Sequence, residues 1–211
     1  MKLYKFRPLS DDKDFDRARA ILDTGSFWCS RFSELNDPME GVFTVPNSEA
    51  VRRIYDKKNK YKICSFSGEG GFSSPLMWGY YANGFKGLAI EVKVDATHVR
   101  SVRYSPAVSD VEILGAKLDI ESLLTIKLNS WAHEWEYRFL KETEKNLCRI
   151  GEISAVYFGD PYGNVDNRDD VYQDNKHLRE YKDLKERLVK VIGKNVNHFT
   201  VSIEGDKVLS K

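Results

Sequence analysis

The chain has 211 residues, enough to bury one substantial hydrophobic core but too few for two full domains. Its 33 Lys and Arg residues nearly balance 32 Asp and Glu residues, and the net charge of +1 gives no long-range attraction to nucleic acid or anionic membranes. No stretch approaches the roughly 18 apolar residues of a membrane span, and the first residues lack the apolar core of a signal peptide. We expect one cytoplasmic domain over residues 1–211, with no membrane partner.

Alternating and helical hydrophobic patterns predict short strands and helices in a mixed order. In the first half we expect strand 3–9, a helix capped by Ser10, Asp11 or Asp12 and ended by Gly25, strand 27–29, helix 49–60 and strand 61–67. In the second half we expect a short helix opened by Pro75, strands 87–92 and 99–104, helix 120–131, strands 135–140 and 153–158, helix 169–194 and strand 199–203. This order favours an α+β fold, with mixed or antiparallel sheets and flanking helices, over a doubly wound sheet.

Two loops between these elements have distinctive sequences. Residues 33–41 contain the turn-forming run Asn36-Asp37-Pro38, and the role of Glu40 beside it stays open. The run Gly68-Glu69-Gly70-Gly71 lacks the Lys-Ser/Thr ending of a phosphate-binding P-loop. We expect this second loop to act as a flexible lid.

The cysteines and histidines predict neither disulfides nor a metal site. Cys29, Cys64 and Cys148 are odd in number, widely spaced and without a CxxC pair, which favours a reducing compartment. The four histidines fall in no metal-ligand spacing, and His133 beside Glu134 is a weak candidate for proton transfer. We therefore expect three buried free thiols and no metal cofactor.

Four sequence pieces, taken together and in order, resemble a known protein family. The pieces are LYKFR at 3–7, LNDPME at 35–40, CSFS at 64–67 with MWGYYA at 77–82 and Gly87, and WAHEWEYR at 131–138. They are similar to the bacterial domain-of-unknown-function family numbered 2971, over roughly the first two thirds of the chain. Because that family has no assigned function, the resemblance by itself implies no particular activity.

Three of these pieces are also similar to the Arg, Ser-x-Ser and Glu-x-Glu motifs of arginine-type ADP-ribosyltransferases, in the same chain order. The matching residues are Arg7, Ser65 with Ser67, and Glu134 with Glu136. Residues i and i+2 of a strand share a face, so we expect the two serines to point one way and the two glutamates likewise. The resemblance implies an ADP-ribosyltransferase-like fold that holds NAD as its substrate between the first strand and the strand of the glutamates.

The resemblance also implies a role for each residue that binds NAD. Arg7 presents a planar guanidinium that fits the pyrophosphate of NAD. Ser67 is also expected to bind NAD. Trp78, Tyr80 or Tyr81 stacks on the nicotinamide ring. The spacing of the motifs is longer than in compact toxins of this type, and Phe66 stands between the two serines.

The implied catalytic residues are two glutamates and one serine. Cleavage of the nicotinamide bond builds positive charge on the ribose, which Glu136 stabilises by gripping a ribose hydroxyl. Glu134 orients or deprotonates the acceptor, with a raised pKa where the two carboxylates crowd each other. Ser65 positions the catalytic glutamate. The acceptor is an unknown protein or nucleic acid, and a toxin or anti-phage effector with an immunity protein would suit such an enzyme.

Two other functions, and a purely structural interpretation, fit the same sequence. The alternation of charged and aromatic residues over 134–139 is also typical of an ordinary half-buried strand. A non-catalytic module that binds a nucleotide or protein for regulation is the first alternative function. A nucleic-acid processing protein is the second, since basic residues gather in two stretches. These residues are Arg52, Arg53, Lys57, Lys58, Lys60 and Lys62 in one stretch, and Lys176, Arg179, Lys182, Lys185, Arg187 and Lys190 in the other.

Overall fold

The computed structural model describes residues 1–35, 48–106, 120–166, 168–205 and 207–210. Its main sheet contains β1 (Lys2–Pro8), β3 (Tyr61–Ser67), β4 (Gly87–Lys93), β5 (Val99–Ser101), β8 (Glu136–Glu142), β10 (Glu152–Asp160), β11 (Asn197–Glu204) and β12 (Lys207–Ser210). Two small sheets pair β2 (Ser26–Trp28) with β9 (Leu147–Arg149), and β6 (Arg103–Ser105) with β7 (Ile126–Leu128). The helices are α1 (Asp12–Thr24), α2 (Ser48–Asn59), α3 (Glu69–Phe72), α4 (Pro75–Tyr81), α5 (Ile120–Leu123), α6 (Arg168–Asp174) and α7 (Lys176–Val191), with the 3-10 helices η1 (Phe32–Glu34), η2 (Ala96–His98) and η4 (Asn129–Glu134).

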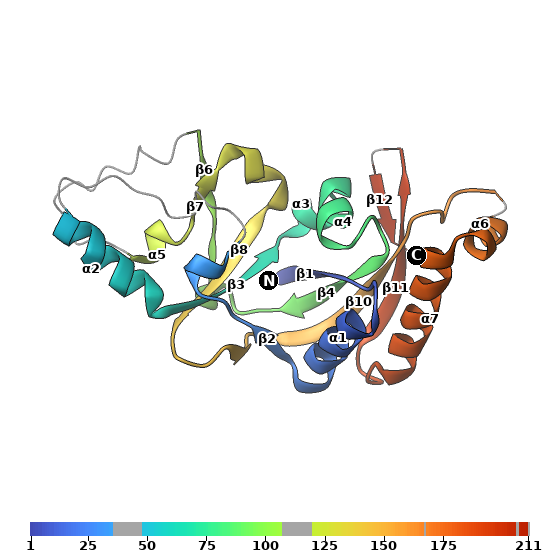
Figure 1. Cartoon of the computed structure of the whole chain (residues 1–211), viewed down its shortest axis with the longest axis horizontal. Coiled ribbons are helices and arrows are strands. Elements are labelled where there is room, and N and C mark those ends of the chain that lie inside the picture. The colour runs from blue at the N-terminus through green and yellow to red at the C-terminus, as the bar shows by residue number, and fades with distance from the viewer. Residues whose placement is uncertain (36–47, 107–119, 167, 206, 211) are drawn as a thin grey trace.

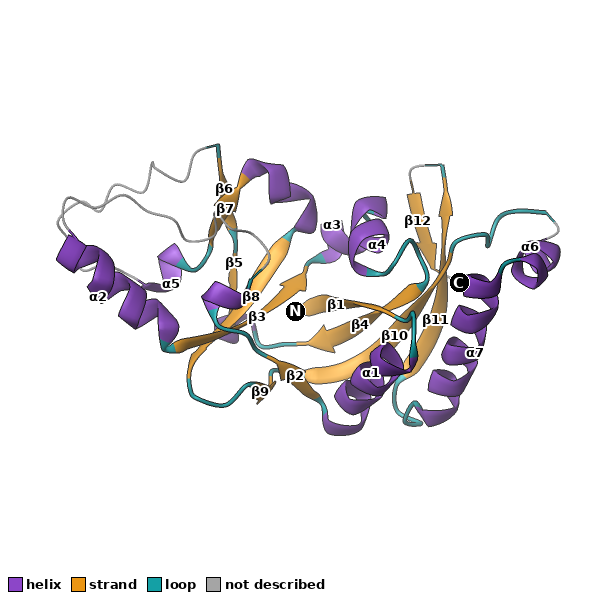
Figure 2. Cartoon of the chain, in the orientation of Figure 1, coloured by secondary structure: helices purple, strands orange, loops and turns teal. Residues whose placement is uncertain are grey.

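The main sheet has eight strands in the order β12-β11-β10-β4-β1-β3-β8-β5 (Figure 1). Only β10 and β11 run parallel, and every other neighbouring pair in this sheet is antiparallel. Helices lie on both sides of it (Figure 2). The expected α+β fold with a mixed sheet and flanking helices is therefore confirmed. Within the described part of the chain, no helix is both long and apolar enough to cross a membrane.

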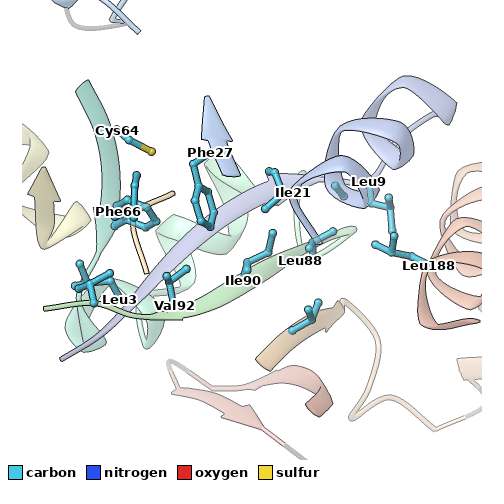
Figure 3. Packing of buried hydrophobic residues seen from close by; sticks show 14 of the residues in the cluster. Leu3, Leu9, Ile21, Phe27, Cys64, Phe66, Leu88, Ile90, Val92 and Leu188 are labelled. Atoms are coloured by element: carbon cyan, nitrogen blue, oxygen red, sulfur yellow. The ribbon is translucent and has the colours of Figure 1, made fainter. Parts of the chain in front are cut away.

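The two faces of the sheet are buried under different helices. On one face, side chains of β1 and β4 pack with α1 and α7, and Figure 3 shows Leu3, Ile21, Leu88 and Leu188 in this cluster. On the other face, Tyr4 and Phe6 of β1 pack with Met77 and Trp78 of α4. Both faces of β4 are buried, which explains why its sequence is almost continuously apolar.

Helix α1 begins and ends where the sequence predicts. The Asp11 carboxylate accepts a hydrogen bond from the Asp14 backbone N–H (2.8 Å). Gly25 ends the helix in the left-handed conformation (φ 64°), where its N–H donates to the carbonyl of Ile21 (2.8 Å). A carboxylate at the first cap satisfies a backbone donor that otherwise lacks an intrahelical partner.

Replacing this cap is expected to cost a measurable amount of stability. Asp11→Ala should lower the free energy of unfolding by about 1 kcal/mol, because the Asp14 N–H loses its partner. Urea denaturation provides the measurement. Asp16→Ala, at an exposed position inside the same helix, is the matched control and should change stability by less than about 0.5 kcal/mol. Equal losses in both variants would contradict the cap.

The prediction of a continuous helix over 120–131 is wrong. Helix α5 ends at Leu123, and the Thr125 hydroxyl just after it donates to the carbonyl of Glu121 (2.8 Å). Residues 126–128 then pair with β6 as strand β7. Pairing with a distant strand has overridden the local helical pattern, and it turns Lys127 toward the interior of the protein.

Three smaller expectations also differ from the structure. The expected strand 99–104 is divided at Val102, whose N–H donates to the carbonyl of Glu136 (2.9 Å). The expected helix 169–194 is two helices, because Asn175 caps α7 by accepting from the N–H of His177 (3.0 Å). The expected lid at 68–71 is largely helix α3.

Candidate functional site

The site begins where β1 and β3 separate. These neighbours share a single pair, Tyr4 with Ser67, although β1 pairs with β4 along all seven of its residues. A continued ladder would place Phe6 opposite Ser65. Instead, the Lys5 ammonium donates to the carbonyl of Ser65 (2.7 Å) and takes the place of a backbone donor. A charged side chain therefore satisfies the edge of β3 where the two strands separate.

A cavity of about 600 Å³ adjoins this separation, a volume typical of small-molecule sites. Side chains of both sheet faces line it, together with residues of α4 and η4. Positive and negative charges are balanced in the lining. The basic lining residues are Lys5, Arg7, Lys127 and Arg138, and the acidic ones are Asp14, Glu34, Glu134 and Glu136.

The cavity brings together most of the residues singled out in the sequence. The predicted site residues in its lining are Arg7, Ser65, Ser67, Tyr80, Tyr81, Glu134 and Glu136. They come from β1, β3, α4, η4 and β8. The first and last of them, Arg7 and Glu136, are 129 positions apart in the sequence (136 − 7). The structure thus brings three separate motifs to one cavity, although the strand register puts Arg7 on the opposite sheet face from Ser65, Ser67 and Glu136.

Arg7 has spare hydrogen-bonding capacity. Its Nε is buried and has no hydrogen-bond partner among the described residues. Burial lowers the pKa of Arg7, and the nearby charge of Arg17 lowers it further, while Cys64 and Asp14 oppose this. A buried donor without a partner is rare and costly in proteins, so a ligand acceptor at this point would be favourable.

Glu136 is buried and strongly bonded. Arg138 grips it through two hydrogen bonds, Nε to Oε1 (2.8 Å) and Nη2 to Oε2 (3.0 Å). The Lys127 ammonium also donates to Oε2 (3.3 Å). Burial raises the pKa of Glu136, whereas Lys127 and a hydrogen bond with Ser65 oppose the rise. Ser65 therefore lies near enough to affect the glutamate that it was expected to position.

Glu134 reaches the same network from a different backbone. It is the last residue of η4 rather than part of a strand, and Trp135 after it is left-handed (φ 46°). The expected i, i+2 alignment of Glu134 and Glu136 on a strand is therefore wrong. Lys127 nevertheless joins the two carboxylates, since its Nζ lies 2.7 Å from Glu134 Oε2.

The hydroxyl of Tyr81 completes this arrangement. It donates to Glu134 Oε1 at 2.5 Å. Burial raises the pKa of Tyr81, and the bond to Glu134 raises it further, so the phenol stays protonated. The Tyr81 hydroxyl is thus already bonded to Glu134, whereas the neighbouring ring of Tyr80 is exposed.

Lys127 and Arg138 are members of the site that sequence reasoning did not select. For Lys127, burial alone would lower the pKa, but the charges of Glu136 and Glu134 outweigh burial and raise it. Arg138 stands two residues after Glu136 on β8, so strand alternation could have predicted that both side chains share a face. Lys127 gave no such signal, because it falls in the segment expected to be helical.

Trp78 does not belong to the site. Its ring has 0% exposure, and it packs between Phe6 and Phe85 in the core. Its indole N–H donates to the carbonyl of Phe72 (2.8 Å). The prediction that Trp78 stacks on nicotinamide is wrong, because the ring has no surface left to offer a ligand.

The glycine-rich segment is packed against the site. A side chain at Gly70 would lie 2.4 Å from the Trp135 ring, and one at Gly71 would lie 2.6 Å from the carbonyl of Glu134. These close approaches explain the glycines, and they contradict a free lid. The turn at Asn36-Asp37-Pro38 and the open question of Glu40 lie outside the described residues.

The first basic stretch is not one exposed face. Lys58 and Lys62 have 1% and 5% exposure, and the Lys58 ammonium lies 4.2 Å from the centre of the Phe32 ring. In the second stretch, Arg187 pairs with Asp12 (2.9 Å). Several of these charges are therefore engaged within the protein.

The described residues contain no group of three or more His, Cys, Asp or Glu side chains arranged to hold a metal ion. Comparison with models of protein families, with curated proteins and with solved structures gives no significant match. The resemblances to family 2971 and to the ADP-ribosyltransferases therefore stay predictions, and the geometry of the cavity carries the functional argument.

Proposed function

We propose that the cavity binds NAD and cleaves its nicotinamide–ribose bond, passing ADP-ribose to a macromolecular acceptor or to water. One observation carries this proposal. Arg7, Ser65 and Glu136, from three distant segments, line the same cavity of about 600 Å³. In this proposal the fold is ADP-ribosyltransferase-like, with the ligand between the Arg7 strand and the Glu136 strand.

The proposed roles follow the charge of the reaction. The free donor of Arg7 receives an oxygen of the pyrophosphate, which a guanidinium binds well. As nicotinamide leaves, positive charge develops on the ribose, and the buried Glu136 carboxylate stabilises it. Arg138 and Lys127 hold that carboxylate in place, and Ser65 lies beside it in its proposed positioning role. The exposed ring of Tyr80 stacks on the nicotinamide.

Glu134 is assigned to the acceptor. Its carboxylate bonds Tyr81 and Lys127, so acceptor activation requires one of these bonds to exchange for the incoming nucleophile. The acceptor is a protein or a nucleic acid. By fold-level analogy, a toxin or anti-phage effector held in check by an immunity protein would use such a reaction.

The test is the release of nicotinamide from NAD. Purified protein is incubated with NAD, with and without cell lysate, and free nicotinamide is measured by chromatography. Glu136→Gln is expected to reduce release by about 10²-fold or more, because the amide lacks the stabilising charge. Glu142→Gln, an exposed change on the same strand, is the matched control and should act like the wild type.

A second variant tests the proposal without changing Glu136, whose substitution could affect folding. Arg7→Lys keeps the positive charge but loses the planar guanidinium, and should weaken NAD binding while leaving the Glu136 network intact. Circular dichroism checks that each variant is folded. Neither release nor binding of NAD by the folded wild type, in any lysate, would reject the proposal.

A non-catalytic binding module is the second candidate, and one observation favours it. Both oxygens of Glu136 are already bonded by Arg138 and Lys127, which is the arrangement of a satisfied structural carboxylate. Such a module binds NAD or another nucleotide without turnover. Calorimetric binding that is equal in the wild type and Glu136→Gln, with no nicotinamide released, would favour this candidate.

A further inference from the structure

Three cysteines that are far apart in the sequence gather in one core cluster. Cys29, Cys64 and Cys148 are all buried and free, and all belong to the cluster drawn in Figure 3, where Cys64 is labelled. The expectation of buried free thiols is confirmed. Their proximity was not expected, because no sequence spacing links them.

The backbone register places two of these cysteines face to face. Ser30 and Ile63 form an antiparallel bridge and exchange both backbone hydrogen bonds, at 2.9 and 2.7 Å. They are therefore a hydrogen-bonded pair, and the next pair along is Cys29 opposite Cys64 (30 + 63 = 29 + 64). The Cys29 N–H donates to Asn146 (2.6 Å) on the other side, as a non-hydrogen-bonded position requires.

A non-hydrogen-bonded pair has the spacing that a disulfide needs. Its Cα atoms lie about 4.5 Å apart, and its two side chains share a face. Disulfides span Cα separations of about 4.4–6.8 Å. The register of the Ser30–Ile63 bridge therefore places Cys29 and Cys64 at a position whose usual spacing suits a disulfide.

The third cysteine is placed less favourably. Cys148 lies opposite Phe27, so it is diagonal to Cys29. Diagonal neighbours have Cα atoms about 7–8 Å apart, beyond the usual reach of a disulfide, although the Cys148 thiol is near enough to raise the pKa of Cys29. Cys29 lies between β9 and β3, which puts Cys148 and Cys64 two strands apart.

The surroundings of Cys64 favour its reactive form. Burial would raise the pKa of Cys64, but a hydrogen bond with Cys29 and the charges of Lys5 and Arg7 lower it to about 7. The hydrogen bond with Cys64 and burial raise the pKa of Cys29, so Cys29 keeps its proton. A thiol of lowered pKa beside a thiol of raised pKa is the arrangement that reacts with peroxides and then closes.

We propose that Cys29 and Cys64 form a reversible cross-strand disulfide when the protein meets hydrogen peroxide. The Cys64 thiolate attacks one peroxide oxygen, the O–O bond breaks, and Cys64 becomes a sulfenic acid while hydroxide leaves. The Cys29 sulfur then attacks the Cys64 sulfur, the S–O bond breaks, and the hydroxyl leaves with the Cys29 proton as water. In total two thiols and one peroxide give one disulfide and two waters.

Access to the buried pair requires only a local opening. The Ser30–Ile63 contact is an isolated bridge rather than part of a longer ladder, so separating these segments disrupts little structure. The proposal does not depend on NAD chemistry. Its connection to the candidate site is physical, since Lys5 and Arg7 line the cavity and also stabilise the Cys64 thiolate.

The test maps the bond directly. Reduced protein at low concentration, freed of reductant, is treated with a slight excess of hydrogen peroxide, and its intact mass is measured. We expect the loss of two hydrogen atoms per chain, a Cys29–Cys64 cross-linked peptide after digestion, and full reversal by dithiothreitol. Mapping in the wild-type protein avoids any effect of substitutions on folding.

Variants identify the partner. Cys148→Ser is expected to form the same bond in the same yield, whereas Cys29→Ser and Cys64→Ser should lose the intramolecular cross-link entirely. A bond that includes Cys148, or a wild-type chain that keeps all three thiols after peroxide treatment, would overturn the proposal.

Discussion

Arg138→Met is expected to lower the free energy of unfolding by about 3–5 kcal/mol. The guanidinium has 1% exposure, makes two hydrogen bonds to Glu136, and donates to the carbonyl of Leu124 (2.5 Å). Methionine fills a similar volume but leaves the carboxylate and the carbonyl without these donors. Removing one partner of a buried ion pair costs much more than the pair itself contributes, because the remaining charge stays buried.

Urea denaturation of three further variants separates this effect from general damage. Arg100→Met is the matched control, since Arg100 stands opposite Arg138 on the edge strand β5 but has an exposed side chain. Its surface pair with Glu121 should contribute at most about 1 kcal/mol. Glu136→Gln alone and combined with Arg138→Met completes a double-mutant cycle.

The cycle distinguishes a buried charge from a lost contact. The double variant should be more stable than the sum of the two single losses implies, by about 1 kcal/mol or more, because it leaves no unpaired carboxylate. Strictly additive losses would show that Arg138 and Glu136 are not energetically coupled. The cycle tests the network independently of any enzyme activity.

The elements that sequence patterns predict well are those whose burial repeats regularly. Strand β1 alternates, β4 is apolar on both faces, and α1 carries its own cap and stop at Asp11 and Gly25. Residues 126–128 show the opposite case. They become a strand because they pair with β6. The paired residues, Arg103 and Ile126, are 23 positions apart (126 − 103), so the local hydrophobic pattern does not predict this strand.

For the candidate site too, residues on regular strands could be predicted, and residues that depend on long-range pairing could not. Ser65 and Glu136 lie on regular strands and share one sheet face, as alternation predicts. The register puts Arg7 on the opposite face, so it reaches the same cavity only because β1 and β3 separate there. Lys127 reaches the carboxylates only through the unexpected strand β7. The pairing of Cys29 with Cys64 depends on one long-range bridge, which no spacing in the sequence encodes.

Trp78→Ala is expected to destabilise the protein by about 3–5 kcal/mol, the usual cost of truncating a large buried aromatic side chain. The sequence presents Trp78 and Tyr80 as equivalent aromatics two residues apart on a short helix. The structure separates them, since Trp78 has 0% exposure and Tyr80 has 71%. Removing the indole leaves a cavity among Phe6, Phe72 and Phe85 and an unsatisfied carbonyl at Phe72.

Tyr80→Ala is the matched control on the same helix. Its free energy of unfolding should change by less than about 0.5 kcal/mol, because the ring is largely in solvent. The proposed role of Tyr80 predicts weaker NAD binding by this variant, measured by calorimetry, at unchanged stability. A Trp78→Ala protein as stable as the wild type would contradict the packing of α4. A stable Tyr80→Ala protein that binds NAD as tightly as the wild type would remove Tyr80 from the site, because an exposed ring without a ligand has no other reason to matter there.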